Sequence, residues 1–301
     1  MNIITIQNKK YPKLLKKIGK DAPKQLYYKG TWDNDIFQNC LAVVGTRHLT
    51  SYGRQVTERL VTEIAAAGIT IVSGFMYGGD AAAHKAAVRA GGRTIAVMPC
   101  GIDRIHPEYQ QDLYVEILKN KGLIISEYEG DAMPVNWMYP RRNRIVAGLS
   151  KATLVVEAGL KSGTLITTAF TQKFGRKIFA VPGPITSEVS QGTSQLLKEG
   201  AQLVASAKDI LDFFGLKRLT LNVPQAIGIC GSRTSRGKSD FNGSETLEQK
   251  IAEYLRREPM EIDDLSRIFG ISAVNLGVAL SLMELNGIIK QEGGKWRSNL
   301  I

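Results

Sequence analysis

Short apolar runs alternate with amphipathic stretches through the middle of this 301-residue chain, and this alternation restricts its fold more than any other feature. The apolar runs predict buried strands, and the stretches between them have helical periodicity. We therefore expect an α/β fold, in which a parallel sheet has helices on both faces. The predicted strands are LAVVG, ITIVS, TIAVMP, LIISE, ATLVVEA and KIFAVPG, and the predicted helices lie at 50–68, 80–90, 107–120, 141–149, 162–174 and 190–199.

Composition excludes several classes of protein. No run of 18 or more apolar residues occurs, and the N-terminus lacks the apolar block of a signal peptide, so we expect a cytoplasmic chain with no membrane partner. Cys40, Cys100 and Cys230 are scattered and odd in number. Neither a disulfide framework nor a zinc site is expected.

The net charge of +11 is unevenly distributed. Residues 1–30 carry eight lysines and one aspartate, whereas residues 31–216 have 19 basic and 17 acidic side chains. Residues 217–244 carry a net charge of +4, and residues 245–301 a net charge of −2. We expect four parts: a basic N-terminal arm (1–30), the α/β core (31–215), a linker (216–244) and a C-terminal domain (245–301).

The C-terminal part predicts a small winged-helix domain. A helix capped by Ser244 precedes a helix-turn-helix pattern, and IIKQEGGKWRS predicts a β-hairpin. The second helix of this pattern offers Asn275 and no arginine, and the domain has a negative charge. These features favour an auxiliary or protein-contact role over strong binding of duplex DNA.

Three turns rich in glycine and hydroxyl groups follow predicted strands. Parallel sheets bind ligands beyond the carboxyl ends of their strands, where backbone amides can hold phosphate. A tight turn would also explain each of them singly. None has the spacing of a dinucleotide or nucleoside-triphosphate loop. The turns contain Gly45, Thr46 and Arg47; Ser73 and Gly74, before a helix capped by Asp80; and Lys161, Ser162, Gly163 and Thr164.

The stretch YPRRNRIVAGLS predicts a helix that begins at Pro140 with Arg141, Arg142 and Arg144 in its first turn. Cations at that end oppose the helix dipole, so a bound anion or neighbouring carboxylates must compensate them. The nearby aromatic rings can stack on bases or simply pack. The candidate carboxylates are Glu127, Glu129 and Glu157, and the aromatic residues are Tyr128, Trp137 and Tyr139.

Catalytic residues are not evident. His84 is predicted as a half-buried helix histidine, and no Ser-His-Asp set or metal-ligand spacing occurs. Asp80, Glu127 and Glu157 could meet as an acid and a base, but no reaction follows from them. We expect a protein that is not an enzyme and that needs neither a cofactor nor a metal.

Several motifs appear together in one order: VVGTR, VSGF…GGDAAAHKAA, GGRTIAVMPCGID, SEY, YPRRNRIVAGLS, LVVEAGLKSGTLIT, GRKIFAVPG and LLKEGA. In this order the chain resembles the DprA/Smf family, the DNA processing proteins of natural transformation, over about residues 40–205. The resemblance implies an extended Rossmann-like core that forms a homodimer, binds and protects incoming single-stranded DNA, and loads RecA recombinase. The DNA-binding residues it implies are Gly45, Thr46, Arg47, Ser73, Gly74, Tyr139, Arg141, Asn143, Arg144, Lys161, Ser162, Gly163 and Thr164.

The chain departs from this family at positions near the expected groove. Tyr77 stands where an arginine is common, Gly79 replaces an isoleucine, His106 replaces a tyrosine, and Glu108 lies at a position that is often basic. These departures predict weaker or differently placed DNA binding. Two alternatives remain: a nucleotide- or phosphoribosyl-binding enzyme similar to LOG-type phosphoribohydrolases, whose Pro-Gly-Gly-x-Gly-Thr turn is absent, and a winged-helix regulator whose core senses a nucleotide.

Overall fold

The computed structural model describes residues 2–216 and 247–299, apart from Glu258, Gly270, Ser272, Asn286 and Gly293. The chain divides into two compact units, residues 1–226 and 227–301. The expected linker, Cys230 and the Ser244 cap lie outside the described residues, except for Leu216 at the start of the linker. Among the described residues, no helix combines the length and the apolar character needed to cross a membrane.

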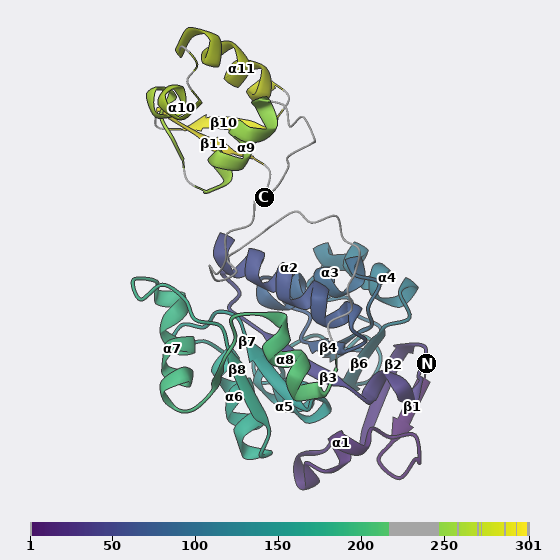
Figure 1. Ribbon diagram of the computed structural model, residues 1–301. Helices are drawn as coiled ribbons and strands as arrows, with labels where there is room; N and C mark the ends of the chain where they lie inside the picture. The colour runs from purple at the N-terminus through teal and green to yellow at the C-terminus, as the bar shows by residue number, and fades with distance from the viewer. Residues whose placement is uncertain are drawn as a thin grey trace. The chain divides into compact units, whose positions relative to one another are not determined.

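The first unit is built on one sheet with the strand order β1-β2-β6-β5-β4-β3-β7-β8-β9 (Figure 1). The strands from β3 to β9 pair in parallel, and β1 and β2 add an antiparallel edge. All six predicted strands are confirmed, as β3 to β8. The bounds are β1 (Asn2–Thr5), β2 (Gln25–Gly30), β3 (Cys40–Val44), β4 (Thr70–Ser73), β5 (Thr94–Gly101), β6 (Leu123–Tyr128), β7 (Ala152–Val155), β8 (Lys177–Ala180) and β9 (Gln202–Leu203).

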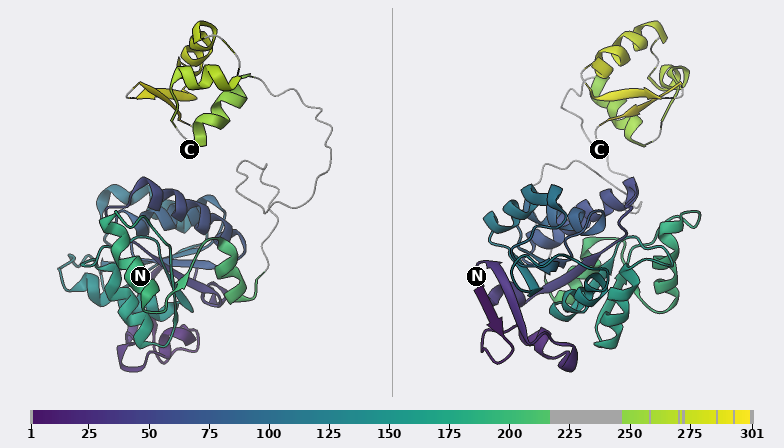
Figure 2. Two further views of the ribbon diagram at one scale, coloured as in Figure 1. Left: turned by 60° about the vertical axis from the view of Figure 1, so that its left-hand side comes forward. Right: turned by 180° about the vertical axis from the view of Figure 1, so that it is seen from behind.

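Helices cover both faces of this sheet (Figures 1 and 2), so the predicted α/β architecture is confirmed. One face carries α1 (Lys13–Lys16), α5 (Met138–Leu149), α6 (Thr164–Lys173) and α7 (Gln191–Lys198). The other carries α2 (Ser51–Ala66), α3 (Gly79–Arg89), α4 (Gln111–Lys119) and α8 (Ala207–Phe214), of which α8 was not predicted.

The order of the strands indicates where on the sheet a ligand site is expected. The chain runs from β3 outward through β4, β5 and β6, and then returns to β7 on the other side of β3. Connections therefore leave in opposite directions between β3 and β7, which is where parallel sheets bind ligands. Helices α3, α5 and α6 begin at this carboxyl end, so their positive dipole ends gather there.

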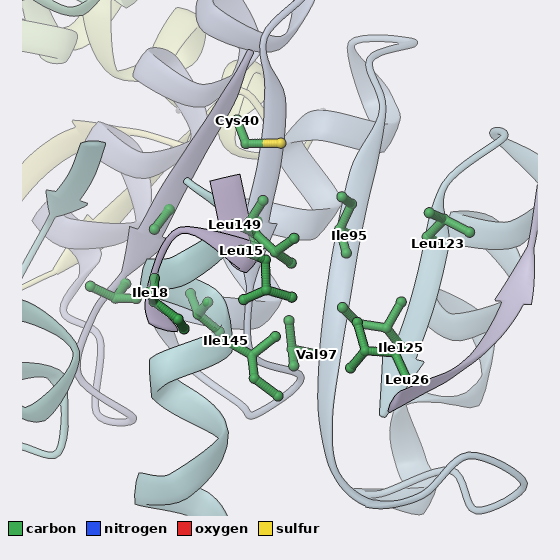
Figure 3. Packing of buried hydrophobic residues seen from close by; sticks show 14 of the residues in the cluster. Leu15, Ile18, Leu26, Cys40, Ile95, Val97, Leu123, Ile125, Ile145 and Leu149 are labelled. Atoms are coloured by element: carbon green, nitrogen blue, oxygen red, sulfur yellow. The ribbon is translucent and has the colours of Figure 1, made fainter. Parts of the chain in front are cut away.

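The N-terminal segment differs from the expected basic arm, because its apolar side chains are part of the core. β2 pairs with β6, and Leu15, Ile18 and Leu26 pack into the main cluster (Figure 3). Gly148 of α5 shows how close this packing is, since a Cβ atom there would lie 2.7 Å from Leu15 Cδ1. The many lysines of residues 1–30 led to the prediction of a basic arm. In the structure most of these lysines are exposed, whereas most of the apolar residues between them are buried.

The second unit has the elements of a winged helix, as predicted. Its core includes Ile251, Leu265, Leu280 and Trp296. A backbone bridge joins Met260 to Trp296, so the hairpin is tied to the helices. The elements are α9 (Leu247–Arg257), α10 (Ile262–Phe269), α11 (Ala273–Leu285) and an antiparallel pair, β10 (Ile289–Glu292) and β11 (Lys295–Ser298).

We predict that Leu15→Ala lowers the free energy of unfolding of the first unit by about 2–5 kcal/mol, because it opens a cavity between α1 and α5. Ile185→Ala is the control, since Ile185 is 94% exposed, and its effect should stay within about 0.5 kcal/mol. Urea unfolding of the full chain, followed by tryptophan fluorescence, measures both. Equal transitions for Leu15→Ala and the wild type would show that the N-terminal segment is a detachable arm.

Candidate nucleic-acid interface

Backbone hydrogen bonds join the turns that follow β3, β4 and β7. The Thr46 amide donates to the Glu157 carbonyl at 2.8 Å, and the Gly79 amide donates to the Thr46 carbonyl at 3.0 Å. Gly78 has φ +78°, and a side chain there would overlap the carbonyls of Thr46 and Arg47. The three turns predicted to hold phosphate therefore lie against one another at the carboxyl end of the sheet.

Glu157 has a structural role beneath these turns. Its buried carboxylate accepts hydrogen bonds from the amide of Thr50 at 2.9 Å and from the hydroxyl of the same residue at 2.5 Å. The Thr50 hydroxyl oxygen in turn accepts from the Gly53 amide and caps α2. Glu157 thus holds the start of α2 against the β3–β7 end of the sheet.

Arg47 is exposed beside these turns and lies between two aromatic rings. Its guanidinium carbon is 5.7 Å from the ring centroid of Tyr77 and 5.5 Å from that of Tyr139. The Tyr139 hydroxyl is 2.8 Å from His106 Nε2. Burial, with Arg104 nearby, lowers the pKa of His106, so its imidazole is neutral at physiological pH. An exposed cation between flat rings can bind a phosphate, and a base can stack on a ring face that Arg47 does not cover.

One face of α5 connects this group to the turn after β7. Tyr139 and Asn143 are four residues apart, so they share a helix face. The Asn143 side-chain amide donates to the Gly163 carbonyl at 3.4 Å, whereas Tyr139 lies against Arg47. In the same turn, the Ser162 hydroxyl oxygen accepts from the Thr164 amide at 3.2 Å. This face of α5 therefore lies between the Arg47 turn and the Lys161–Thr164 turn.

Arg142 is buried under the same end of the sheet. Its Nη1 donates to the Val97 carbonyl at 2.8 Å, and its Nη2 is 3.9 Å from the Asp80 carboxylate. Burial lowers the pKa of Arg142, and Asp80 opposes that shift. Asp80 also accepts hydrogen bonds from the Ser73 hydroxyl and the Met76 amide. The buried pair thus holds the turn after β4.

Arg144 and Arg141 meet the same carboxylate on another side of α5. Arg144 Nη2 is 2.5 Å from Glu127 Oε1, and Arg141 Nε is 3.4 Å from Glu127 Oε2. The Arg144 side chain is buried, whereas that of Arg141 is about half exposed and packs on the Trp137 ring. Glu127, one of the three carboxylates predicted as partners, therefore compensates these two arginines.

The structure separates the predicted site residues by their exposure. The buried ones can contribute backbone groups or support, since the Ser73 hydroxyl already donates to the Val43 carbonyl at 2.6 Å. Arg47, Arg141, Lys161 and Gly163 are exposed; Gly45, Tyr139, Asn143 and Ser162 are partly exposed; Thr46, Ser73, Gly74, Arg144 and Thr164 are buried.

Three details differ from the sequence analysis. His84 is fully buried, whereas a half-buried position was predicted. Its Nε2 lies 2.5 Å from the Gly74 carbonyl oxygen and its Nδ1 lies 2.7 Å from the Thr94 hydroxyl. Asp80 is the second residue of α3, and Gly78 holds the N-cap position. The carboxylates of Asp80, Glu127 and Glu157 each bind their own neighbours and do not form an acid–base pair.

In the sequence, Tyr77 and His106 stand out as departures near the expected groove, but they are not among the predicted DNA-binding residues. Both follow strands that end at the same edge, Tyr77 after β4 and His106 after β5. The rule that ligands bind at the carboxyl ends could have selected them. Their contacts with Arg47 and Tyr139 needed the tertiary structure.

We predict that Arg142→Ala lowers the free energy of unfolding by about 3–5 kcal/mol, because it removes the buried cation that pairs with the Asp80 carboxylate and donates to the Val97 carbonyl. The neighbouring Arg141→Ala is the matched control, and it should cost about 1 kcal/mol or less because Arg141 is exposed. Urea unfolding compares them. If both arginines gave the same small loss, Arg142 would not be the support of the turn after β4.

Comparison with known proteins adds independent findings. Residues 2–215 match the family described as DNA recombination-mediator protein A, and residues 242–295 match the DprA winged helix domain. Protein Smf of Synechocystis is 33% identical over 313 aligned residues, covering 97% of this chain and 78% of that protein. The DNA processing protein DprA of Bacillus subtilis is 38% identical over 212 residues, covering 70% and 71%.

Two solved structures share the fold of the first unit. DprA from Streptococcus pneumoniae superimposes with a TM-score of 0.65 at 37% identity, covering 70% of this chain and 73% of that one. DprA from Helicobacter pylori has a TM-score of 0.63 at 34% identity, covering 71% and 96%, and its structure is described as giving insight into a single-stranded DNA binding mode.

Proposed function

Since this chain belongs to the DNA recombination-mediator protein A family, also called DprA/Smf, we propose that it binds single-stranded DNA along the partly exposed face of α5 that carries Tyr139 and Asn143. The observation that carries the proposal is the position of Arg47 between Tyr77 and Tyr139. It offers a cation for a phosphate and ring faces for bases at the end of the sheet where ligands bind.

Physical features of this end favour a single strand over a duplex. Tyr77 is 37% exposed and Trp137 is 52% exposed, and stacking of a base on such a ring contributes about 1–3 kcal/mol. Bases paired inside a duplex cannot reach these rings. Arg47 and Lys161 supply exposed positive charge, so binding depends on salt and has little sequence preference.

Tyr77 and His106 make the proposed site of this chain differ from that of its relatives. Tyr77 packs against Arg47 where relatives commonly have a second cation, and His106 holds the Tyr139 hydroxyl. This chain therefore gains a stacking surface and loses a phosphate contact. Its affinity depends less steeply on salt than that of a groove with both cations.

Membership of the family supports a wider role. The protein protects incoming single-stranded DNA in the cytoplasm, acts as a homodimer and loads a RecA-type recombinase during DNA uptake, without catalysing a reaction. The non-catalytic role is supported by the carboxylates near the site, which are held by Arg144, Ser73 and Thr50. The winged-helix unit has an auxiliary or protein-contact role. Asp263 and Asp264 place negative charge at the start of α10, which disfavours strong binding of duplex DNA.

We predict that Arg47→Ala raises the Kd for labelled oligo-dT about tenfold, since a charge-assisted phosphate contact contributes about 1.5 kcal/mol or more. It should also lower the salt slope by about 0.7. Arg59→Ala, at an exposed position of α2, is the control and should leave Kd within about twofold. Fluorescence anisotropy over a salt series gives both values.

The proposal fails if Arg47→Ala binds like the wild type, or if duplex DNA of the same length binds as tightly as the single strand. Circular dichroism of each variant separates a local loss of contact from unfolding.

A further inference from the structure

A second basic site lies at the opposite end of the sheet from Arg47. A pocket of about 830 Å³ is lined by Lys151, which precedes β7, and by Lys177, the first residue of β8. These positions are at the amino ends of parallel strands, whereas Arg47 follows the carboxyl end of β3. The pocket is therefore separate from the proposed DNA groove.

Positive charge dominates this pocket. The N-terminal segment contributes two lysines, and the segment from the end of α6 to the start of β8 contributes three cations. The lining has one carboxylate, that of Asp21. The six cationic residues are Lys17, Lys20, Lys151, Lys173, Arg176 and Lys177.

The negative ends of nearby helix dipoles do not compensate all of this positive charge. Helices α5, α6 and α8 end at this edge, and each C-terminus carries roughly half a negative charge. These three ends and Asp21 together offset about 2.5 of the six positive charges, which leaves an excess of about 3.5. The surplus is what a bound anion would compensate.

Some of the cationic side chains are held by contacts within the protein, and others are free to bind an anion. Arg176 donates to the carbonyls of Leu14 at 2.9 Å and Gly148 at 2.8 Å, and burial lowers its pKa to about 10, so it remains protonated at neutral pH. Lys173 is ion-paired with Asp21 at 2.5 Å. Lys17, Lys20 and Lys177 make no side-chain hydrogen bond or ion pair with any described residue.

Two phenylalanines give the pocket apolar surface. Phe174 lies 5.9 Å from the Arg176 guanidinium carbon, and Phe213 is 45% exposed. An exposed ring beside several free ammonium groups provides a stacking face together with phosphate ligands. Nucleotides carry both chemistries, whereas inorganic polyanions use only the charge.

We propose that this pocket binds a nucleoside triphosphate, with the phosphate chain on Lys17, Lys20 and Lys177 and the base against an exposed phenylalanine. The volume is in the range of small-molecule sites. A triphosphate chain carries about four negative charges at neutral pH, because its terminal phosphate contributes nearly two. This matches the excess, whereas a DNA backbone brings one charge per nucleotide. The proposal does not depend on the DNA-binding function.

Titration of fluorescently labelled ATP into the full chain, followed by anisotropy, tests this site. Lys17→Ala combined with Lys177→Ala should weaken binding about tenfold, since two charge contacts are lost. Lys13→Ala combined with Lys198→Ala is the matched control. It removes two exposed lysines, one from the N-terminal segment and one from α7, that do not line the pocket, and should change Kd by less than about twofold. Arg47→Ala should also leave ATP binding unchanged.

Several outcomes would overturn the proposal: no ATP binding by the wild type, equal losses in the pocket and control variants, or a loss caused by Arg47→Ala. Displacement of ATP from the Arg47→Ala variant by oligo-dT would make the pocket a nucleic-acid contact instead. The Kd of the Lys17→Ala, Lys177→Ala variant for oligo-dT is measured as well, and it should equal that of the wild type. This second measurement distinguishes a loss of ATP binding from a loss of DNA binding.

Discussion

The buried guanidinium of Arg142 is the contact on which the proposed DNA groove depends. A charge inside the protein is tolerated only with partners, and here these are the Val97 carbonyl and the Asp80 carboxylate. Because Val97 is in β5 and Asp80 is in α3, the contact fixes the rotation of α5 relative to the sheet. That rotation directs Tyr139 toward Arg47 and Asn143 toward Gly163.

Helix α5 also connects the two ends of the first unit. Its N-terminal half carries Tyr139 and Asn143 of the proposed DNA groove, and its C-terminal carbonyls are bound by Arg176, which lines the basic pocket. Packing of Leu15 on Gly148 holds that second end in place. The N-terminal segment thus supports the groove through α5 and supplies two lysines to the pocket. In the proposed nucleotide site, the positive charge of this segment has a specific role, in addition to general attraction of polyanions.

The sequence predicted the sheet and the three turns at its carboxyl end well, because apolar runs and glycine-rich turns are local signals. It did not distinguish three closely spaced arginines of α5, since burial of Arg142 and Arg144 depends on Asp80 and Glu127, which lie far away in the sequence. Tyr77 and His106 were noted as departures near the expected groove, but their contacts with Arg47 and Tyr139 were not predicted, for the same reason. In residues 1–30 the lysines masked a weak apolar pattern, and β1, β2 and α1 escaped prediction.

Mapping of cross-links to a single strand tests the central claim most directly. Oligo-dT containing 4-thiothymidine would be irradiated with the full chain, and modified peptides would be identified by mass spectrometry. The account predicts adducts in peptides that contain Tyr77, Trp137 or Tyr139, whose rings border the Arg47 turn and α5. Adducts confined to the winged-helix unit, or to the lysines around the basic pocket, would contradict it.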